Sequence, residues 1–179
     1  MSGHSHWAGI KHKKEITDQK RGKVFSRLLV AISAAAKSEP NPDFNPRLRT
    51  AIMKAKEESV PQENIERAVK RASESGGDLE ELTFEAYGPG GAAIIIEAIS
   101  DNRNRTIQEV KLTLKELGGK WAEAGSVRWA FEPVMDGAER SWKAKFPQIL
   151  PEEDAKKLAA LVAAIEDGDD IQKVFTNAE

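Results

Sequence analysis

Residues 82–99 read LTFEAYGPGGAAIIIEAI and contain two apolar runs separated by a glycine-rich segment. The runs, Leu82 to Tyr87 and Ala92 to Ile99, have the length and the β-branched and aromatic content of strands. Gly88-Pro89-Gly90-Gly91 between them is typical of a tight turn. A phosphate cradle is the alternative, but no Lys-Ser/Thr pair follows the glycines. The stretch therefore predicts two strands joined by a turn.

The residues that follow predict a helix-covered sheet. Thr106 and Glu109 have the spacing of a capping box, and Gly118-Gly119 predicts the end of that helix. Pro151, followed by three acidic residues, predicts the start of a second helix. Three more strands are expected, over residues 126–132, 141–150 and 171–176. After the leading strand this order is ferredoxin-like, with an antiparallel sheet and both helices on one face.

The residues before the sheet have helical periodicity. Apolar residues three and four apart predict a helix from about Ile16 to Lys37. Asn45-Pro46 is typical of an N-cap followed by proline and predicts a second helix. A third starts near Pro61 and ends before the linker Ser75-Gly76-Gly77. Together these segments form a three-helix module.

Length and composition agree with an α+β protein of two units: a three-helix module at 16–77 and a sheet domain at 78–179. Hydrophobic residues make up 40% of the chain and charged residues 31%, which is ordinary for a folded protein. No apolar run is long enough for a membrane helix. The absence of cysteine excludes disulfides and thiolate chemistry and fits a reducing compartment, so we expect a cytoplasmic protein.

The charge is unevenly distributed. Residues 1–77 carry a net charge of +6 and residues 78–179 a net charge of -8. Residues 1–37 hold 8 basic and 2 acidic side chains, so this stretch supplies the basic excess. Such asymmetry indicates a polyanionic partner at the N-terminal end.

The basic segment is the main candidate for contact with nucleic acid. Residues 1–15 have few large apolar groups and are predicted to be a mobile tail, while the following helix carries cations on one stripe. Lysines and arginines at such spacing can reach successive phosphates, and aromatic rings can stack on bases. The candidate residues are His4, His6, Trp7, Lys11, His12, Lys13, Lys14, Lys20, Lys23 and Arg27. A merely solvated basic face is the alternative, equally good on composition alone.

Arg103 and Arg105 form a second candidate, because two arginines before a helix could grip phosphate. Loop capping is the preferred alternative for this segment. The three histidines come without a carboxylate or cysteine set, so no metal is expected, and no cofactor site is seen. Acidic residues at 166–170 suggest a solvated helix end or a face for a basic partner. No nucleophile, base or metal set supports an enzyme.

Several separated motifs resemble the YebC family in order along the chain. They are SGHSHW (2–7), IKHKK (10–14), NPRLR (45–49), PQENIERA (61–68), YGPGG (87–91), DNRNRT (101–106), GSV (125–127) and DDIQ (169–172). The resemblance implies a probable transcriptional regulator, with mitochondrial relatives that activate translation and bacterial relatives tied to the ribosome. His6 stands where lysine is usual in that family.

The resemblance also implies a third domain inserted between two strands of the second. Only a short loop with Asp136-Gly137 lies between Phe131 and Trp142, so the inserted domain is expected to be missing near residues 133–140. The strands on either side are retained as a hairpin.

We therefore expect a non-enzymatic nucleic-acid-binding regulator of gene expression. RNA or the ribosome is the preferred partner, because no helix-turn-helix recognition helix is evident and a long duplex would be repelled by the acidic half. A DNA-binding transcriptional regulator and a protein-interaction module are the alternatives. A monomer without membrane contact is expected.

Overall fold

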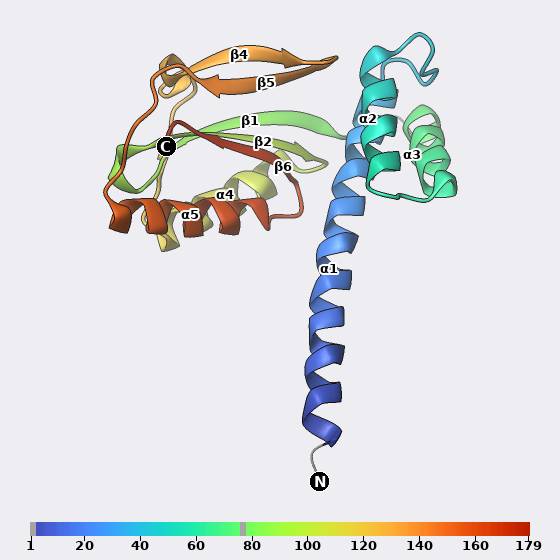
Figure 1. Ribbon diagram of the computed structural model, residues 1–179. Helices are drawn as coiled ribbons and strands as arrows, with labels where there is room; N and C mark the ends of the chain where they lie inside the picture. The colour runs from blue at the N-terminus through green and yellow to red at the C-terminus, as the bar shows by residue number, and fades with distance from the viewer. Residues whose placement is uncertain (1–2, 76–77) are drawn as a thin grey trace.

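The structure, a computed structural model, describes residues 3–75 and 78–179, with side chains at 17–74 and 78–179. A long helix with two shorter helices packed at one end stands beside a sheet domain (Figure 1). The α+β class, with a helical module followed by an antiparallel sheet domain, is confirmed. No helix in the described ranges is long and apolar enough to cross a membrane.

Three helices form the first unit: α1 (Gly3–Ala36), α2 (Pro46–Glu57) and α3 (Gln62–Ser75). The predicted N-cap is confirmed, since the Asn45 side chain accepts a hydrogen bond from Leu48 N at 3.0 Å. Its amide donates to the carbonyl oxygens of Ala35 and Glu39, which ties the start of α2 to the end of α1. The small core that results contains Ile32, Ala35, Ala36, Leu48, Ala51, Ala55, Val60, Ile65 and Ala68.

The first helix begins earlier than expected. Helical backbone starts at Gly3 rather than near Ile16, so most of the segment predicted as a tail belongs to α1. No proline interrupts residues 3–36, and each residue added to an existing helix gains one hydrogen bond. Met1 and Ser2 lie outside the described residues, as do Gly76 and Gly77 of the expected linker.

Four antiparallel strands form the main sheet in the order β3-β1-β2-β6. They are β1 (Glu80–Tyr87), β2 (Ala93–Ser100), β3 (Lys120–Ala122) and β6 (Ile171–Thr176). The predicted turn between the first two is a 3-10 turn, η1 (Pro89–Gly91), closed by a bond from Gly88 N to Ala92 O of 2.8 Å. Gly90 takes a φ of +71°, which favours glycine, so the motif serves the turn.

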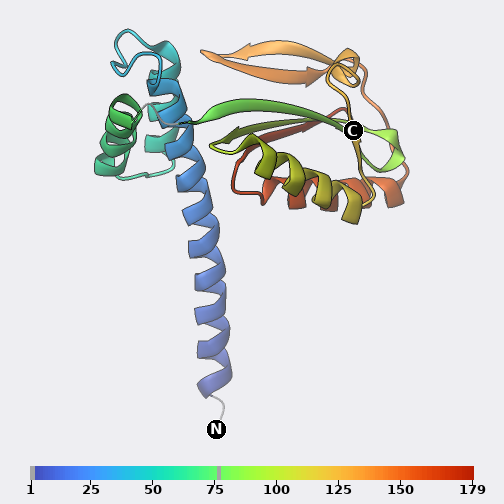
Figure 2. The ribbon, with the colours of Figure 1, turned by 180° about the vertical axis from the view of Figure 1, so that it is seen from behind.

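Two helices cover one face of this sheet, as predicted: α4 (Arg103–Glu116) and α5 (Glu152–Glu166) (Figure 2). The start of α4 differs from the expected capping box. Asn102 is the N-cap and accepts from Arg105 N at 3.1 Å. Thr106 lies inside the helix and is fully buried. Its hydroxyl donates to Asp170 at 2.6 Å, so it does not cap the helix.

The opposite face of the sheet is covered by a two-stranded ribbon of β4 (Phe131–Asp136) and β5 (Glu139–Ala144). The ribbon lies above the sheet instead of joining it, so the strand order differs from the expected split arrangement. Residues 126–130 are also not a strand. The buried carboxylate of Glu85 accepts from the backbone of Gly125 and Val127, and a 3-10 turn, η2 (Arg128–Ala130), follows.

Candidate nucleic-acid interface

The helix α1 holds most of the predicted contact residues. Its 34 residues correspond to about 50 Å, and its N-terminal half extends beyond both units (Figure 1). Seven of the predicted contact residues belong to this half: His4, His6, Trp7, Lys11, His12, Lys13 and Lys14. Their side chains lie outside the part of the chain whose side chains the structure describes.

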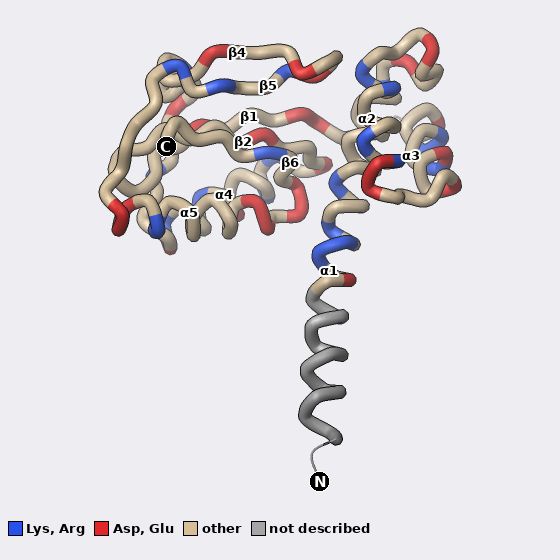
Figure 3. Tube along the Cα trace, viewed as in Figure 1, with Lys and Arg blue, Asp and Glu red and all other residues tan. Residues whose placement is uncertain are grey.

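Basic residues lie along the described part of α1 (Figure 3). Its described side chains begin at Thr17, and Lys20 is exposed. Arg21 follows, with its guanidinium 5.3 Å from the ring centroid of Phe25. The positive surface of α1 therefore continues at least to residues 20–21.

The next two predicted contacts bind the sheet domain instead. Lys23 Nζ donates to the carboxylate of Asp167 at 2.7 Å and to its carbonyl oxygen at 3.0 Å. Arg27 donates from Nη2 to the carbonyl oxygen of Glu166. The hydrogen bond from Lys23 holds the pKa of Asp167 below its usual range. Both cations thus hold the carboxyl end of α5 against α1.

Within the acidic segment at 166–170, the basic partner of Asp167 is therefore α1 of the same chain. Because Glu166 contributes only its carbonyl oxygen, the Asp167 carboxylate supplies the charge that faces the helix. The Asp167 side chain is 74% exposed, so water and ions have access to this ion pair. An accessible ion pair of this kind is weak and can exchange partners.

Arg103 and Arg105, the second predicted site, are also engaged within the chain. Arg103 pairs with Glu80 at 3.2 Å. Arg105 pairs with Asp101 at 2.8 Å and with Asp170 at 3.0 Å. These ion pairs link the start of α4 to β1 and to the residue before β6, while the Asn102 side chain caps the helix.

Asp170 is the centre of that cluster. Burial raises its pKa, but hydrogen bonds from Thr106, Arg105 and Ser100 together outweigh burial and hold the pKa below its usual range. The Ser100 hydroxyl donates to it at 3.0 Å. The carboxylate therefore fixes the β2–α4 connection to the start of β6.

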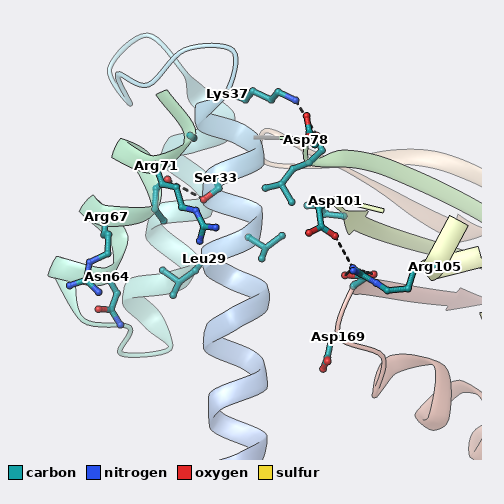
Figure 4. A pocket seen from close by; sticks show the side chains of 16 residues that line it. Leu29, Ser33, Lys37, Asn64, Arg67, Arg71, Asp78, Asp101, Arg105 and Asp169 are labelled. Carbon is teal, nitrogen blue, oxygen red and sulfur yellow. Dashed lines mark hydrogen bonds and ion pairs between the residues drawn. The ribbon is translucent and has the colours of Figure 1, made fainter. Parts of the chain in front are cut away.

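An open cleft of about 650 Å³ separates the two units beside α1 (Figure 4). The helical module contributes the cations Lys37, Arg67 and Arg71, and the sheet domain contributes mainly acidic residues, among them Asp78 and Asp169. Opposite charges thus face each other across the cleft. Lys37 Nζ closes one end by donating to the carbonyl oxygen of Leu79 at 3.2 Å.

The sequence did not point to a second tie between the units. Glu139, at the tip of the ribbon, accepts from Lys54 of α2 at 2.6 Å and from Lys173 of β6 at 3.0 Å. Arg47 pairs with Glu81 nearby at 2.7 Å. These residues lie tens of positions apart in the chain, so no local pattern marks them.

Fold and charge define a two-unit α+β protein in which one basic helix belongs to a small helical module and lies against an acidic sheet domain. The chain belongs to the TACO1/YebC family. The model described as "TACO1/YebC protein N-terminal domain" matches residues 5–75, and "TACO1/YebC second and third domain" matches residues 79–136. The resemblance seen in the motifs is confirmed.

Similar proteins cover the chain to different extents. A "probable transcriptional regulatory protein" of Chloroherpeton thalassium is 39% identical over the whole chain, which covers 96% of that protein. A "probable transcriptional regulatory protein" of Solibacter usitatus is 52% identical over 74% of this chain. The match covers 54% of that relative, so the chain spans about half of its length. A conserved hypothetical protein of Aquifex aeolicus, solved by crystallography, is similar in fold, with a TM-score of 0.84, 35% identity, and coverage of 98% of this chain and 97% of that one.

Proposed function

We propose that this protein is a non-enzymatic regulator of gene expression that binds RNA or the ribosome through α1. The observation that carries the proposal is the excess of cations in the segment that contains α1: 8 basic against 2 acidic residues at 1–37, with Lys20 exposed. Cations on one helix neutralise successive phosphates and release counterions, which favours binding. The names of the relatives support a role in regulation.

The charges on α3 disfavour the helix-turn-helix mode of binding DNA. In a helix-turn-helix protein the second helix lies in the major groove. On α3 the cations are paired with acidic residues one turn away: Arg67 with Glu63 at 2.8 Å and Lys70 with Glu74 at 3.7 Å. A helix that presents acidic side chains of this kind is repelled by the phosphates that line a major groove, whereas binding through α1 does not require α3 to enter a groove. The acidic sheet domain adds to this repulsion.

Ribosome co-sedimentation tests the proposal. The parent protein should sediment with ribosomes at low salt, and replacing the four lysines Lys11, Lys13, Lys14 and Lys20 with alanine should abolish this association. The matched control removes the same charge from the sheet domain, by replacing Lys115, Lys120, Lys156 and Lys157, and should still sediment. Absence of association in the parent would reject the ribosome as partner.

Salt dependence tests the charge mechanism with purified RNA. About five phosphate contacts on a single strand give a log–log slope of affinity against salt near -3.5. The four-lysine variant should lower that slope to about -0.7, because each lost contact removes about 0.7. A flat response in the parent rejects the mechanism. Tighter binding to duplex DNA than to RNA favours the alternative, a DNA-binding transcriptional regulator.

A further inference from the structure

The sheet domain carries an exposed pair of aromatic rings far from α1 in the sequence. Trp129 and Phe146 are 58% and 52% exposed, with ring centroids 5.9 Å apart and an angle of 36° between the rings. Trp129 lies in η2 just before β4, and Phe146 follows β5. The backbone N–H groups of Lys145 and Phe146 both donate to the carbonyl oxygen of Ala130, so the base of the ribbon fixes both rings.

The other tryptophans with described side chains take part in packing. Trp121 packs on Phe84 in the core between the sheet and the helices, at 5.3 Å. Trp142 packs under the ribbon and donates from Nε1 to Glu97 at 2.9 Å. Trp129 has no such role, and its ring is exposed beside that of Phe146. Two rigid rings exposed together favour a binding role over a structural one.

The stretch of sequence that carries Phe146 is basic, although Glu132 lies opposite Lys143 in the ribbon. The stretch from Arg140 to Pro151 holds three cations and no acidic residue, although the domain as a whole is strongly acidic. Lys143 and Lys145 are exposed, and Lys145 Nζ lies 5.4 Å from the centroid of the Phe146 ring. Rings beside cations are the composition that proteins use to bind single-stranded nucleic acid, where bases stack on aromatic faces.

We infer that Trp129 and Phe146 form a stacking site for unpaired bases, with Lys143 and Lys145 beside the flanking phosphates. The inference rests on the proposed function and adds a second contact surface to α1, on the other unit of the molecule. A duplex cannot use this site, because its bases are already stacked on one another. The site therefore selects single strands.

Fluorescence anisotropy with a fluorescein-labelled uridine oligonucleotide tests the site in the full chain. The double variant Trp129→Ala/Phe146→Ala should bind about five-fold more weakly or worse for each ring that stacks a base. Its salt slope should match that of the parent, since no cation is removed. Lys143→Ala/Lys145→Ala should instead lower the slope by about 1.4. Leu112→Ala, which truncates an equally exposed apolar residue on α4, should bind like the parent.

The outcomes separate this inference from the proposed function. If the parent binds no oligonucleotide, the proposed function fails. The stacking site alone fails in another case: the parent binds, the four-lysine variant of α1 binds more weakly, and the ring variant keeps the affinity of the parent. A ring variant that keeps its RNA affinity but loses self-association in sedimentation velocity identifies the rings as a protein interface, which also overturns the site.

Photocrosslinking tests the stacking site without any substitution. Photocrosslinking of 4-thiouridine RNA to the parent should give modified peptides that contain Trp129 or Phe146. Crosslinks confined to other peptides contradict the stacking site. Because both side chains are half exposed, the parent and the ring variant should have equal melting temperatures. Equal melting temperatures exclude unfolding as the cause of any loss of affinity.

Discussion

At the scale of single residues, Glu85 shows how one buried charge organises a loop. Its side chain is almost fully buried and accepts from Gly125 N at 2.7 Å, Val127 N at 2.8 Å and Arg128 Nε at 2.9 Å. Glu85→Ala leaves these donors without their partner and should cost about 2 to 4 kcal/mol of unfolding free energy, measured by urea denaturation. Glu132→Ala, exposed on the ribbon, should stay within about 0.5 kcal/mol. Equal losses in the two variants would contradict this role.

Asp170 gives the molecule a pH-dependent stability. Its pKa is lowered in the folded state, so the ionised carboxylate stabilises the fold above its unfolded pKa, and this stability is lost as the pH falls through the folded pKa. Asp170→Asn should therefore be least stable relative to the parent near neutral pH, and the difference should shrink as the solution is acidified. Urea unfolding at a series of pH values measures it. Asp169→Asn, an exposed neighbour, should change stability little; a gap for Asp170→Asn that is constant with pH contradicts the assignment.

At the scale of elements, the carboxyl end of α5 occupies Lys23 of α1, so under the proposed function we expect it to compete with a phosphate for this lysine. Asp167→Asn frees Lys23 from its partner and should raise RNA affinity about two- to five-fold at low salt, as expected for an exposed ion pair. Anisotropy titration measures the change. Asp136→Asn removes the same charge from the ribbon tip and should have a smaller effect. If both variants gain equally, net charge and not local competition is the cause.

The sequence predicts elements that carry their own local signals. Asn45 and Pro46 define the start of α2, and the strand predicted at 171–176 coincides with β6. The three-residue strand β3 is too short to have a pattern, and the place of the ribbon depends on packing with distant strands. The capping box failed because the Thr106 hydroxyl bonds Asp170, 64 positions away.

The candidate site was predictable to the same degree. The cations at residues 20–27 stand out in the sequence because their spacing is local. Their partners do not, since Lys23 and Asp167 are 144 positions apart. Trp129 and Phe146 show no periodic pattern, and only the structure distinguishes them from the partly buried, packed Trp121 and Trp142.

At the scale of the whole molecule, Glu139 links the ribbon to both units. We propose that it does so because the family's inserted domain is missing here, which leaves Gly137-Ala138 as a tight turn at the tip. Burial raises the pKa of Glu139, but Lys54 and Lys173 outweigh burial and lower it. The ionised form therefore holds α2 against the sheet domain.

Removal of this tie should loosen the two units. Glu139→Ala should broaden the distance distribution between spin labels placed on α2 and α4, and should cost about 1 to 3 kcal/mol of stability, because two partly buried lysines lose their partner. Double electron–electron resonance measures the distribution. Val134→Ala, on the same ribbon, controls for the loss of side-chain volume. An unchanged distribution shows that the other ties suffice.

Only one end of α1 is buried in a core, so the two ends of this helix are held differently. Ile32, Ala35 and Ala36 are clamped in the core of the helical module, while the long arm extends past it. Between the arm and this core, Lys23 and Arg27 bond the carboxyl end of α5. Leu29 and Lys37 lie on either side of Ile32 and line the cleft. We expect a force on the arm to be resisted first at Lys23 and Arg27, the exposed contacts that lie between the arm and the cleft.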